Sequence, residues 1–183
     1  MKVPASAQKV FQGVIFSVYQ WQQQMFDGTT EIFEMLKRPN TIEIIATQGD
    51  KILLSRQSQP TKHNYYALFG GRAEENEEPL VTAQRELLEE SGLVSDDWEL
   101  IKIYQPMHKI DWEIYLFVAR NCKKIGEPDL DPGERIETIS CSFSEFVKIV
   151  EHDDYWGIHL TLDLFKMQQE KTLDIFKNRL LST

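Results

Sequence analysis

Three glutamates, Glu86, Glu89 and Glu90, follow one another at spacings of i, i+3 and i+4 in this 183-residue chain. On a helix, residues three and four apart share a face, so the three carboxylates converge. Two such charges about 6 Å apart repel by roughly 3 kcal/mol at an effective dielectric constant near 20. Mg²⁺ or Mn²⁺ would turn this repulsion into binding energy, because both ions prefer carboxylate oxygens as ligands. The spacing therefore indicates either a divalent-cation site or an acidic face in contact with water.

The residues around the three glutamates carry the start and stop signals of a helix. Pro79 suits a first helical turn and Gly92 suits the position after a last one, so we predict a helix over about residues 79–91. The like charges lie near its C-terminal end, where the helix dipole makes them less favourable. An apolar stripe that can pack on a sheet is predicted at Leu80, Ala83 and Leu87.

The segments before and after this helix are rich in β-branched and aromatic residues, as strands are. Asp27-Gly28 and Gly49-Asp50 supply turn signals, and residues 57–66 and 123–137 have the composition of loops. Strands are predicted at residues 10–25, 30–39, two within 40–57, 99–106, 112–121 and 137–143. Helices are predicted at residues 144–152, with Ser144 as the N-cap, and at residues 157–176. This order predicts an α+β fold, an α/β/α sandwich with a mixed sheet between helices.

Composition narrows the classes of function. With 42% hydrophobic and 27% charged residues, the chain has the composition of a globular protein. The formal net charge of −9 argues against nucleic acid or an anionic membrane as the main partner, because both are bound through clustered Lys and Arg. The sequence contains no run of about 18 apolar residues and no signal-peptide pattern. The two cysteines, Cys122 and Cys141, lack CxxC spacing, so free thiols and a cytoplasmic location are expected.

A longer pattern includes the three glutamates. From Gly71 to Leu93 the sequence matches GX5EX7REUXEEXGU at every defined position, where U is an aliphatic residue. The segment therefore resembles the Nudix hydrolases. That resemblance implies a loop-helix-loop that holds Mg²⁺, with Mn²⁺ as a substitute, against the diphosphate of a nucleoside diphosphate linked to another group. The cations would neutralise the diphosphate and activate the attacking water.

By position, the resemblance also implies roles for single residues. Glu89 and Glu90 would be the principal metal ligands, and Glu86 would be a further ligand or orienting group. Gly71 would let the backbone approach the metal, since glycine has no Cβ. Arg85 would pair with a neighbouring carboxylate and so fix the loop. Supporting roles are implied for Glu77 and Gly92.

The N-terminal hairpin resembles the extra sheet of the branch that hydrolyses ADP-ribose and nucleoside diphosphate sugars. In that branch the hairpin exchanges between two subunits, which implies a homodimer, with residues 1–40 as a dimerisation extension and residues 41–183 as the Nudix domain. Arg38 and Arg56 are candidates to hold phosphate or a terminal ribose, because a guanidinium makes paired contacts to phosphate oxygens; a surface ion pair is equally open for each. Trp21 could stack on a base or pack within the hairpin, and the sequence leaves both roles open. The same two roles are open for Phe11, Phe16 and Tyr19.

The same branch uses a glutamate outside the pattern, on a late loop, as the base or orienting group for the attacking water. Glu134 is our first choice and Glu137 our second, with Asp111 and Glu113 as competitors. A flexible loop can close over the site once substrate is bound, which favours Glu134.

Two departures from the branch leave the sugar open. Phe69 replaces the usual proline before the pattern, and Gln105-Pro106-Met107 stands where ADP-ribose hydrolases carry Ser-Pro-Gly. The expected activity is hydrolysis of ADP-ribose or a related nucleoside diphosphate sugar to a nucleoside monophosphate and a sugar phosphate. The alternatives are hydrolysis of a dinucleotide or a nucleoside triphosphate, and a non-catalytic module that senses a nucleotide.

Overall fold

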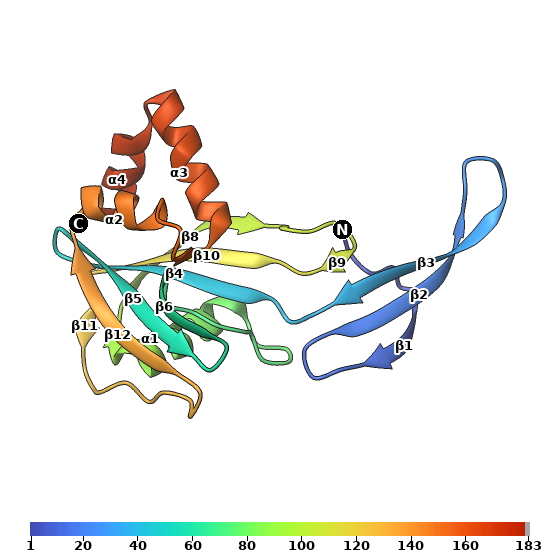
Figure 1. Ribbon diagram of the computed structural model, residues 1–183, viewed down its shortest axis with the longest axis horizontal. Coiled ribbons are helices and arrows are strands. Elements are labelled where there is room, and N and C mark those ends of the chain that lie inside the picture. Colours follow the sequence, from blue (N-terminus) through green and yellow to red (C-terminus); the bar gives the residue numbers. More distant parts are fainter. Residues whose placement is uncertain (182–183) are drawn as a thin grey trace.

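The computed structural model describes residues 1–181, in which a larger and a smaller β-sheet follow one another along the long axis (Figure 1). In spatial order the larger sheet contains β13 (Tyr155–Trp156), β6 (Lys62–Ala67), β5 (Lys51–Gln59), β4 (Thr41–Gln48), β10 (Ile114–Arg120) and β8 (Asp97–Tyr104), with β12 (Arg135–Cys141) also paired to β5. The smaller sheet contains β1 (Gln8–Gln12), β2 (Ser17–Gln24), β3 (Thr30–Lys37) and β9 (Ile110–Asp111). A separate antiparallel pair is formed by β7 (Leu93–Val94) and β11 (Lys123–Lys124). The helices are α1 (Pro79–Ser91), α2 (Phe143–Val150), α3 (Ile158–Glu170) and α4 (Leu173–Leu181).

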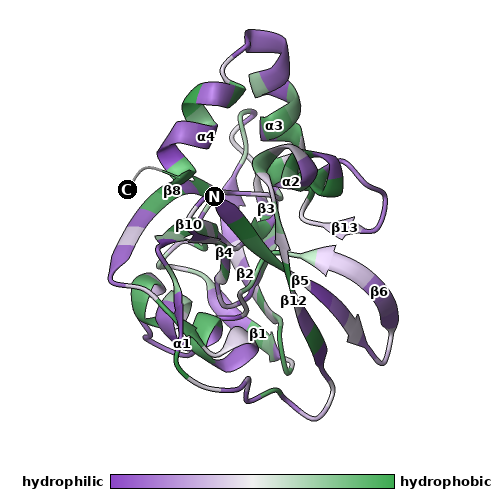
Figure 2. Cartoon of the chain, turned by 90° about the vertical axis from the view of Figure 1, so that its left-hand side faces the viewer, coloured by the Kyte–Doolittle hydropathy of each residue, from purple (hydrophilic) through white to green (hydrophobic). Residues whose placement is uncertain are grey.

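The larger sheet lies between α1 on one face and α2, α3 and α4 on the other (Figure 1). Side chains of β4 alternate between the two faces: Ile42 and Ile44 pack with Leu87 of α1, whereas Ile45 packs with Phe146 of α2. Strand β10 runs parallel to β4 and antiparallel to β8, so the sheet is mixed. In Figure 2 the helices carry both hydrophobic and hydrophilic residues, as expected when only one side is buried. The predicted α+β sandwich is confirmed.

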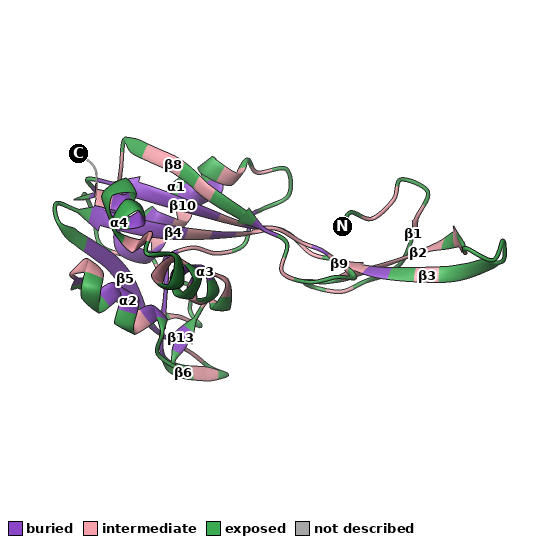
Figure 3. Cartoon of the chain, turned by 90° about the horizontal axis from the view of Figure 1, so that it is seen from above, coloured by how far each residue is buried: buried purple, intermediate pink, exposed green. Residues whose placement is uncertain are grey.

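The smaller sheet projects away from the helices; β1 is exposed throughout, and β2 is mostly half-buried (Figure 3). Strands β2 and β3 form the predicted hairpin, with Gln24 opposite Thr30 at its tip. The single strand predicted over residues 10–25 is wrong, because a turn in which the Gly13 N–H donates to the Phe16 carbonyl (2.8 Å) separates β1 from β2. An added Cβ at Gly13 would lie 2.9 Å from that oxygen, so glycine permits the close approach.

The loop predicted at residues 57–66 is also wrong. Strand β5 continues to Gln59 and β6 begins at Lys62, so the segment is a β-hairpin. Its polar composition is misleading, because the buried Gln57 side chain accepts a hydrogen bond from the Tyr65 hydroxyl (3.0 Å) and donates one to Ser55 (2.8 Å). Polar residues that satisfy each other in this way are compatible with a buried strand.

Two predicted helix boundaries near the C-terminus are wrong. The helix expected over residues 157–176 is interrupted at Lys171, whose φ of 58° lies in the left-handed region and ends α3. The N-cap of α2 is Ser142 rather than Ser144. The Ser142 hydroxyl accepts from the Glu145 N–H (3.3 Å), and the Glu145 carboxylate accepts from the Ser142 N–H (2.8 Å). This reciprocal pair is a capping box, which depends on the spacing of serine and glutamate.

Two expectations from composition can be compared with residues 1–181. Cys122 and Cys141 are buried and form no disulfide, and burial raises the pKa of each thiol to about 11. Within the same residues, no helix combines the length and the apolar character needed to cross a membrane.

Candidate active site

Helix α1 presents its glutamates to a large cleft. The helix starts with Pro79 at its first turn and ends at Gly92, whose φ of 69° is left-handed and whose N–H donates to the Leu88 carbonyl (2.7 Å). Ala83 and Leu87 are buried against the sheet. The third member of the predicted stripe, Leu80, is exposed, which corrects that expectation, and the buried side of the helix is completed by Thr82, Glu90 and Ser91.

The cleft has a volume of about 1120 Å³ and combines residues from six parts of the chain. We call it the acidic cleft. Its charged lining residues are Arg38, Arg72, Glu74, Glu75, Arg85, Glu86, Glu89, Glu90, Asp129, Asp131 and Glu134. Since carboxylates dominate this lining, the cleft attracts cations more than anions.

Arg85 is the counter-ion that holds the carboxylates of α1 together. Its Nε and Nη2 atoms donate to the two oxygens of Glu77, each at 3.0 Å. Its Nη1 atom donates to both Glu86 and Glu89, each at 2.9 Å. The hydrogen bonds from Arg85 lower the pKa of the Glu77 carboxyl to about 2. One guanidinium therefore offsets much of the repulsion that the sequence spacing creates.

Glu90 is the most buried of the three glutamates, with 6% of its surface exposed. Its Oε2 atom accepts a hydrogen bond from the Gly70 N–H (2.7 Å). Burial raises the pKa of Glu90 well above its usual value, and the charges of Glu86 and Glu134 raise it further, whereas the Gly70 N–H opposes the rise. Burial also raises the pKa of Glu86. A nearby positive charge would stabilise the ionised form of Glu86 and of Glu90.

The donor set matches the chemistry of a hard divalent cation. In residues 1–181 no three acidic, histidine or cysteine side chains already converge as a metal-binding group, and Arg85 holds both Glu86 and Glu89. The available oxygens are nevertheless carboxylate oxygens, which Mg²⁺ and Mn²⁺ prefer. An added Cβ on Gly71 would lie 2.5 Å from both carboxylate oxygens of Glu86, so only glycine leaves this carboxylate room beside the backbone. The residues present therefore fit a divalent cation.

The two glycines before α1 are expected to differ in their tolerance of a methyl group. At Gly70 (φ 137°) a Cβ would lie 2.0 Å from the Ile42 carbonyl oxygen, which is backbone and cannot move aside. We expect Gly70→Ala to lower the free energy of unfolding by roughly 2–4 kcal/mol. Gly71→Ala should cost less than about 1 kcal/mol, because only the flexible end of Glu86 must shift. Urea denaturation of both variants checks this difference, and equal losses would contradict it.

The loop of residues 125–134 brings Glu134 into the acidic cleft. Its backbone is attached to the end of α1, since the Ile125 N–H donates to the Gly92 carbonyl (2.9 Å) and the Asp129 N–H donates to the Glu89 carbonyl (2.8 Å). A Cβ on Gly92 would lie 2.1 Å from the Gly126 carbonyl oxygen, so Gly92 also makes room for this loop. Burial, followed by the charge of Asp131, raises the pKa of Glu134.

The three competitors of Glu134 lie outside the acidic cleft. Glu137 is on β12 and lines a small surface pocket with Arg56 and Arg135. Asp111 and Glu113 both pair with Lys2, at 3.4 and 2.9 Å. The structure therefore brings only the first of the four candidates to the glutamates of α1.

Of the predicted substrate-binding residues, the structure places Arg38 in the acidic cleft and the other two elsewhere. The Arg38 guanidinium lies 4.5 Å from the Trp112 ring centroid, and burial, followed by the charge of Arg72, lowers its pKa. Arg56 is exposed on β5 and faces away from the cleft. Trp21 lies on β2, with its ring centroid 5.9 Å from that of Phe33, and does not line the cleft of its own chain.

Two residues that matter to this geometry escaped the sequence analysis. Gly70, whose N–H binds Glu90, is adjacent to the start of the motif but is not one of its defined positions. Arg72 contributes a second guanidinium beside Arg38. The sequence Gly70-Gly71-Arg72, in which a basic residue directly follows two glycines, was the signal that could have identified both residues.

Comparison with known proteins agrees with this arrangement. The model of the NUDIX domain matches residues 37–160. The chain is 25% identical over 176 residues to an ADP-ribose pyrophosphatase of Bacillus subtilis (strain 168), covering 93% of this chain and 94% of that protein. It is also 25% identical over 170 residues to a methanol dehydrogenase activator of Bacillus methanolicus, covering 91% and 92% of the two chains. A solved structure of an ADP compounds hydrolase has the same fold, with a TM-score of 0.70 at 17% identity over 92% of this chain and 95% of that one. With more than half of its length matched by the domain model and the full glutamate pattern on α1, the chain belongs to the NUDIX domain family.

Proposed function

We propose that the protein hydrolyses the diphosphate bond of ADP-ribose or a related nucleoside diphosphate sugar and releases a nucleoside monophosphate and a sugar phosphate. The observation that carries the proposal is the acidic cleft, in which Glu86, Glu89 and Glu90 of α1 meet Glu134 and two arginines. The names of the similar ADP-ribose pyrophosphatase and ADP compounds hydrolase support the choice of substrate class.

Nudix hydrolases generally use divalent metal ions, and we assign Glu86, Glu89 and Glu90 to hold Mg²⁺, with Mn²⁺ as a substitute. A bound divalent cation neutralises the diphosphate charge and polarises the phosphorus–oxygen bond that is broken. Arg38 and Arg72 line the same cleft and can contact phosphate oxygens on the substrate. Their charge helps a protein of net charge −9 to accept an anion.

Glu134 is assigned as the base or orienting group for the attacking water. Its raised pKa and its place in the cleft suit a carboxyl group that takes up a proton. We expect Glu134→Gln to lower kcat by about 10²–10⁴-fold with little change in KM, measured by release of the nucleoside monophosphate. Glu137→Gln is the matched control, because it makes the same change three residues along but outside the cleft. Equal losses in both variants would remove Glu134 from this role.

The substrate class can be tested by chromatography of reaction products. ADP-ribose, GDP-mannose, UDP-glucose, NADH and nucleoside triphosphates are each incubated with Mg²⁺ and, separately, with a chelator. We expect a nucleoside monophosphate from the nucleotide sugars with Mg²⁺ and no product with the chelator. Cleavage of the triphosphates alone would refute the nucleotide-sugar assignment.

A regulatory role is the second candidate, favoured by the similarity to the methanol dehydrogenase activator. In that case the protein would bind a nucleotide and act on a partner enzyme. Calorimetric binding of ADP-ribose with Mg²⁺ present, but without any AMP after long incubation, would favour this role over catalysis.

We further propose that residues 1–40 are a dimerisation extension and residues 41–183 the Nudix domain. The smaller sheet exposes large apolar side chains, among them Phe11 of β1 (60% exposed) and Ile32 of β3 (64% exposed), which a second copy would cover. Such a partner could also bring Trp21 to the other subunit's cleft. We expect Ile32→Glu to convert a dimer into a monomer in light scattering, whereas the neighbouring Glu31→Gln should not. A monomeric wild-type protein would contradict the proposal.

A further inference from the structure

Two guanidinium groups in the acidic cleft have no carboxylate partner of their own. Among residues 1–181, neither Arg38 nor Arg72 forms an ion pair, although most of the charged side chains that line the cleft with them are carboxylates. The two cations also repel each other, since the charge of Arg72, after burial, lowers the pKa of Arg38. Two neighbouring cations without a counter-ion favour an anion that binds both of them.

Aromatic rings hold Arg38 in place of a carboxylate. Its guanidinium carbon lies 4.5 Å from the centroid of the Trp112 ring and 5.7 Å from that of Phe16. The hydrogen bonds that its side chain donates are long, since Nε reaches the Pro39 carbonyl and Nη2 reaches the Thr41 hydroxyl at 3.4 Å each. N–H···O hydrogen bonds usually span about 2.7–3.2 Å, so these two are weak. The attraction of the cation to the face of the indole ring is therefore its main contact.

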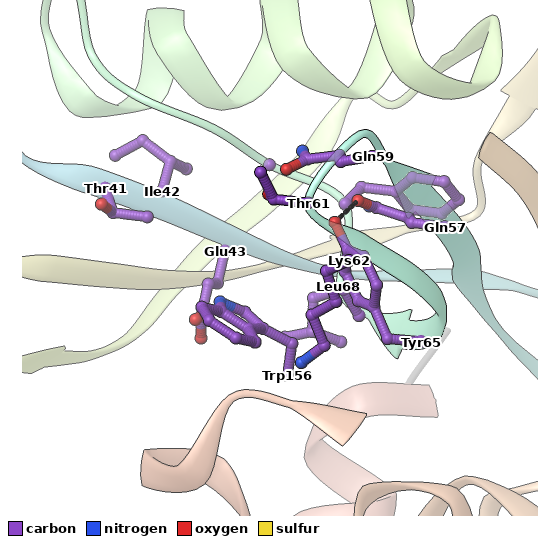
Figure 4. Close-up of a pocket in the computed structure, with 13 residues that line it drawn as sticks. Thr41, Ile42, Glu43, Gln57, Gln59, Thr61, Lys62, Tyr65, Leu68 and Trp156 are labelled. Atoms are coloured by element: carbon purple, nitrogen blue, oxygen red, sulfur yellow. Dashed lines mark hydrogen bonds between the residues drawn. The ribbon is translucent and has the colours of Figure 1, made fainter. Parts of the chain in front are cut away.

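The Trp112 ring is itself fixed in orientation. Its Nε1 atom donates to the Thr41 hydroxyl (3.0 Å), the same oxygen that accepts from Arg38. Thr41 is the first residue of β4 and lines one edge of the smaller pocket between β4 and the β5–β6 hairpin (Figure 4). The Thr41 N–H donates to the Glu113 carbonyl (2.9 Å), and Thr41 also forms a β-bridge with Arg72. The ring and the guanidinium are therefore both anchored to one residue whose backbone is held on two sides.

Trp112 lies at the junction of the two sheets. It follows β9, which pairs with β3 of the smaller sheet, and it precedes β10, which pairs with β4 of the larger sheet. At the same junction the Arg38 N–H donates to the Asp111 carbonyl (3.3 Å). Strand pairing therefore holds the ring of Trp112 and the backbone of Arg38 close to each other.

We propose that Trp112 is a positioning residue, whose ring keeps the Arg38 guanidinium from pairing with the carboxylates of the cleft and leaves its N–H groups free for phosphate oxygens. This inference rests on the proposed hydrolysis of a nucleoside diphosphate sugar, in which Arg38 contacts the diphosphate. An unsupported arginine would pair with a carboxylate, because that contact is strong and charge-assisted, and the substrate would have to break the pair. The face of a ring attracts the cation but leaves the hydrogen-bonding edge of the guanidinium unoccupied.

Replacement of Trp112 by leucine removes the ring face and keeps an apolar side chain. We expect KM for ADP-ribose to rise about 3- to 30-fold and kcat to change less than about threefold, because the phosphate contact is lost equally in the substrate complex and the transition state. Trp112→Phe keeps a ring and should recover most of the affinity. Trp98→Leu is the matched control, because Trp98 is also half-buried and donates to a carbonyl (2.9 Å) but does not line the cleft. It should leave KM unchanged.

A double-mutant cycle tests whether Trp112 acts through Arg38. In an Arg38→Met background, Trp112→Leu should change KM less than about twofold, because the guanidinium that the ring positions is already absent. The same rise of KM in both backgrounds would show that Trp112 acts on the substrate directly or through the fold, and would overturn the proposal. Thermal unfolding curves establish that each variant is folded.

Two measurements do not depend on hydrolysis. The first is calorimetric binding, with Mg²⁺ present, of the methylene analogue of ADP-ribose, in which carbon replaces the oxygen between the two phosphorus atoms. Trp112→Leu should weaken this binding by about the same factor by which it raises KM. The second is the NMR resonance of the Arg38 Nε–H proton, identified by its loss in Arg38→Met. The ring current of Trp112 shifts it upfield, so Trp112→Leu should move it downfield and Trp98→Leu should not.

These measurements separate the role of Trp112 from the proposed function. If the wild type binds the analogue but cleaves no nucleotide sugar, the proposed hydrolysis fails, and the effect of Trp112→Leu on binding still decides the role of the ring. If the wild type cleaves ADP-ribose while Trp112→Leu changes neither KM nor the Arg38 resonance, the hydrolysis stands and the positioning role is refuted. A wild type that neither cleaves nor binds would refute both.

Discussion

Replacement of Glu90 by glutamine is expected to lower kcat by roughly 10³-fold while the protein stays folded. Glu90 has one oxygen bound to the Gly70 N–H, and the other belongs to the carboxylate set assigned to the cation. The amide keeps the first contact but loses the negative charge, so Mn²⁺ affinity measured by calorimetry should fall together with the rate. Glu89→Gln should behave in the same way, because it also removes a carboxylate from α1.

The Glu90→Gln variant should be more stable than the wild type when no divalent cation is present. Burial raises the pKa of Glu90, so the folded protein resists ionisation of this carboxyl, and a neutral amide removes that cost at pH 8. Thermal unfolding with a chelator checks the sign. Glu78→Gln is the control, since Glu78 is exposed at the start of α1 and lies outside the cleft. If Glu89→Gln and Glu90→Gln both keep full activity and cation affinity, the glutamates of α1 are only a solvated acidic face.

Replacement of Arg85 by methionine is expected to lower the free energy of unfolding by about 2–3 kcal/mol at pH 7. Methionine fills a similar volume without charge, so Glu77, Glu86 and Glu89 would lose the counter-ion that they share. A fully buried group of this kind would cost more, but the Arg85 side chain is 27% exposed and water screens part of the interaction. Urea denaturation measures the loss.

The effect of Arg85→Met should depend on pH in a defined direction. Arg85 lowers the pKa of Glu77 to about 2 from a usual value near 4.5. The stabilisation from this pair is therefore complete above pH 4.5 and is lost as the pH falls towards 2. The difference between wild type and variant should be smaller at pH 3 than at pH 7. Arg85→Lys should lie between them, because lysine keeps the charge but cannot bind Glu77 through two nitrogens. A loss below about 0.5 kcal/mol at pH 7 would show that Arg85 is not the main counter-ion.

Local signals were sufficient for the helix that carries the carboxylates. Pro79 and Gly92 define both ends of α1, and the spacing of the glutamates fixes the face on which they lie. The partners of these residues could not be predicted in the same way. Whereas the contact of Arg85 with Glu89 follows from their i, i+4 spacing, the contact of Arg85 with Glu77 and the Gly70 N–H that binds Glu90 depend on how the preceding loop folds against the helix. Such contacts are set by tertiary packing and not by sequence spacing.

The outward position of Arg56 follows from the course of strand β5. With β5 extended through Gln57, the alternation of side chains turns Ser55 and Gln57 inward and Arg56 outward. Burial of a mutually hydrogen-bonded polar cluster is invisible to composition, which is why the continuation of β5 and the start of β6 within residues 57–66 were predicted as a loop.

The attachment of the 125–134 loop to α1 has a consequence for how the length of this loop can vary. The Ile125 N–H binds the carbonyl of Gly92, just after α1, and the Asp129 N–H binds the carbonyl of Glu89 within α1. Among residues 1–181, no backbone hydrogen bond of this kind joins residues 130–133 to α1. Insertions at residues 130–133 are expected to change the reach of Glu134 and to leave these two hydrogen bonds intact. Insertions at residues 126–128 would instead detach the loop from the helix. The length of the second half of the loop therefore sets how far Glu134 extends over the glutamates, while the first half keeps the loop attached to α1.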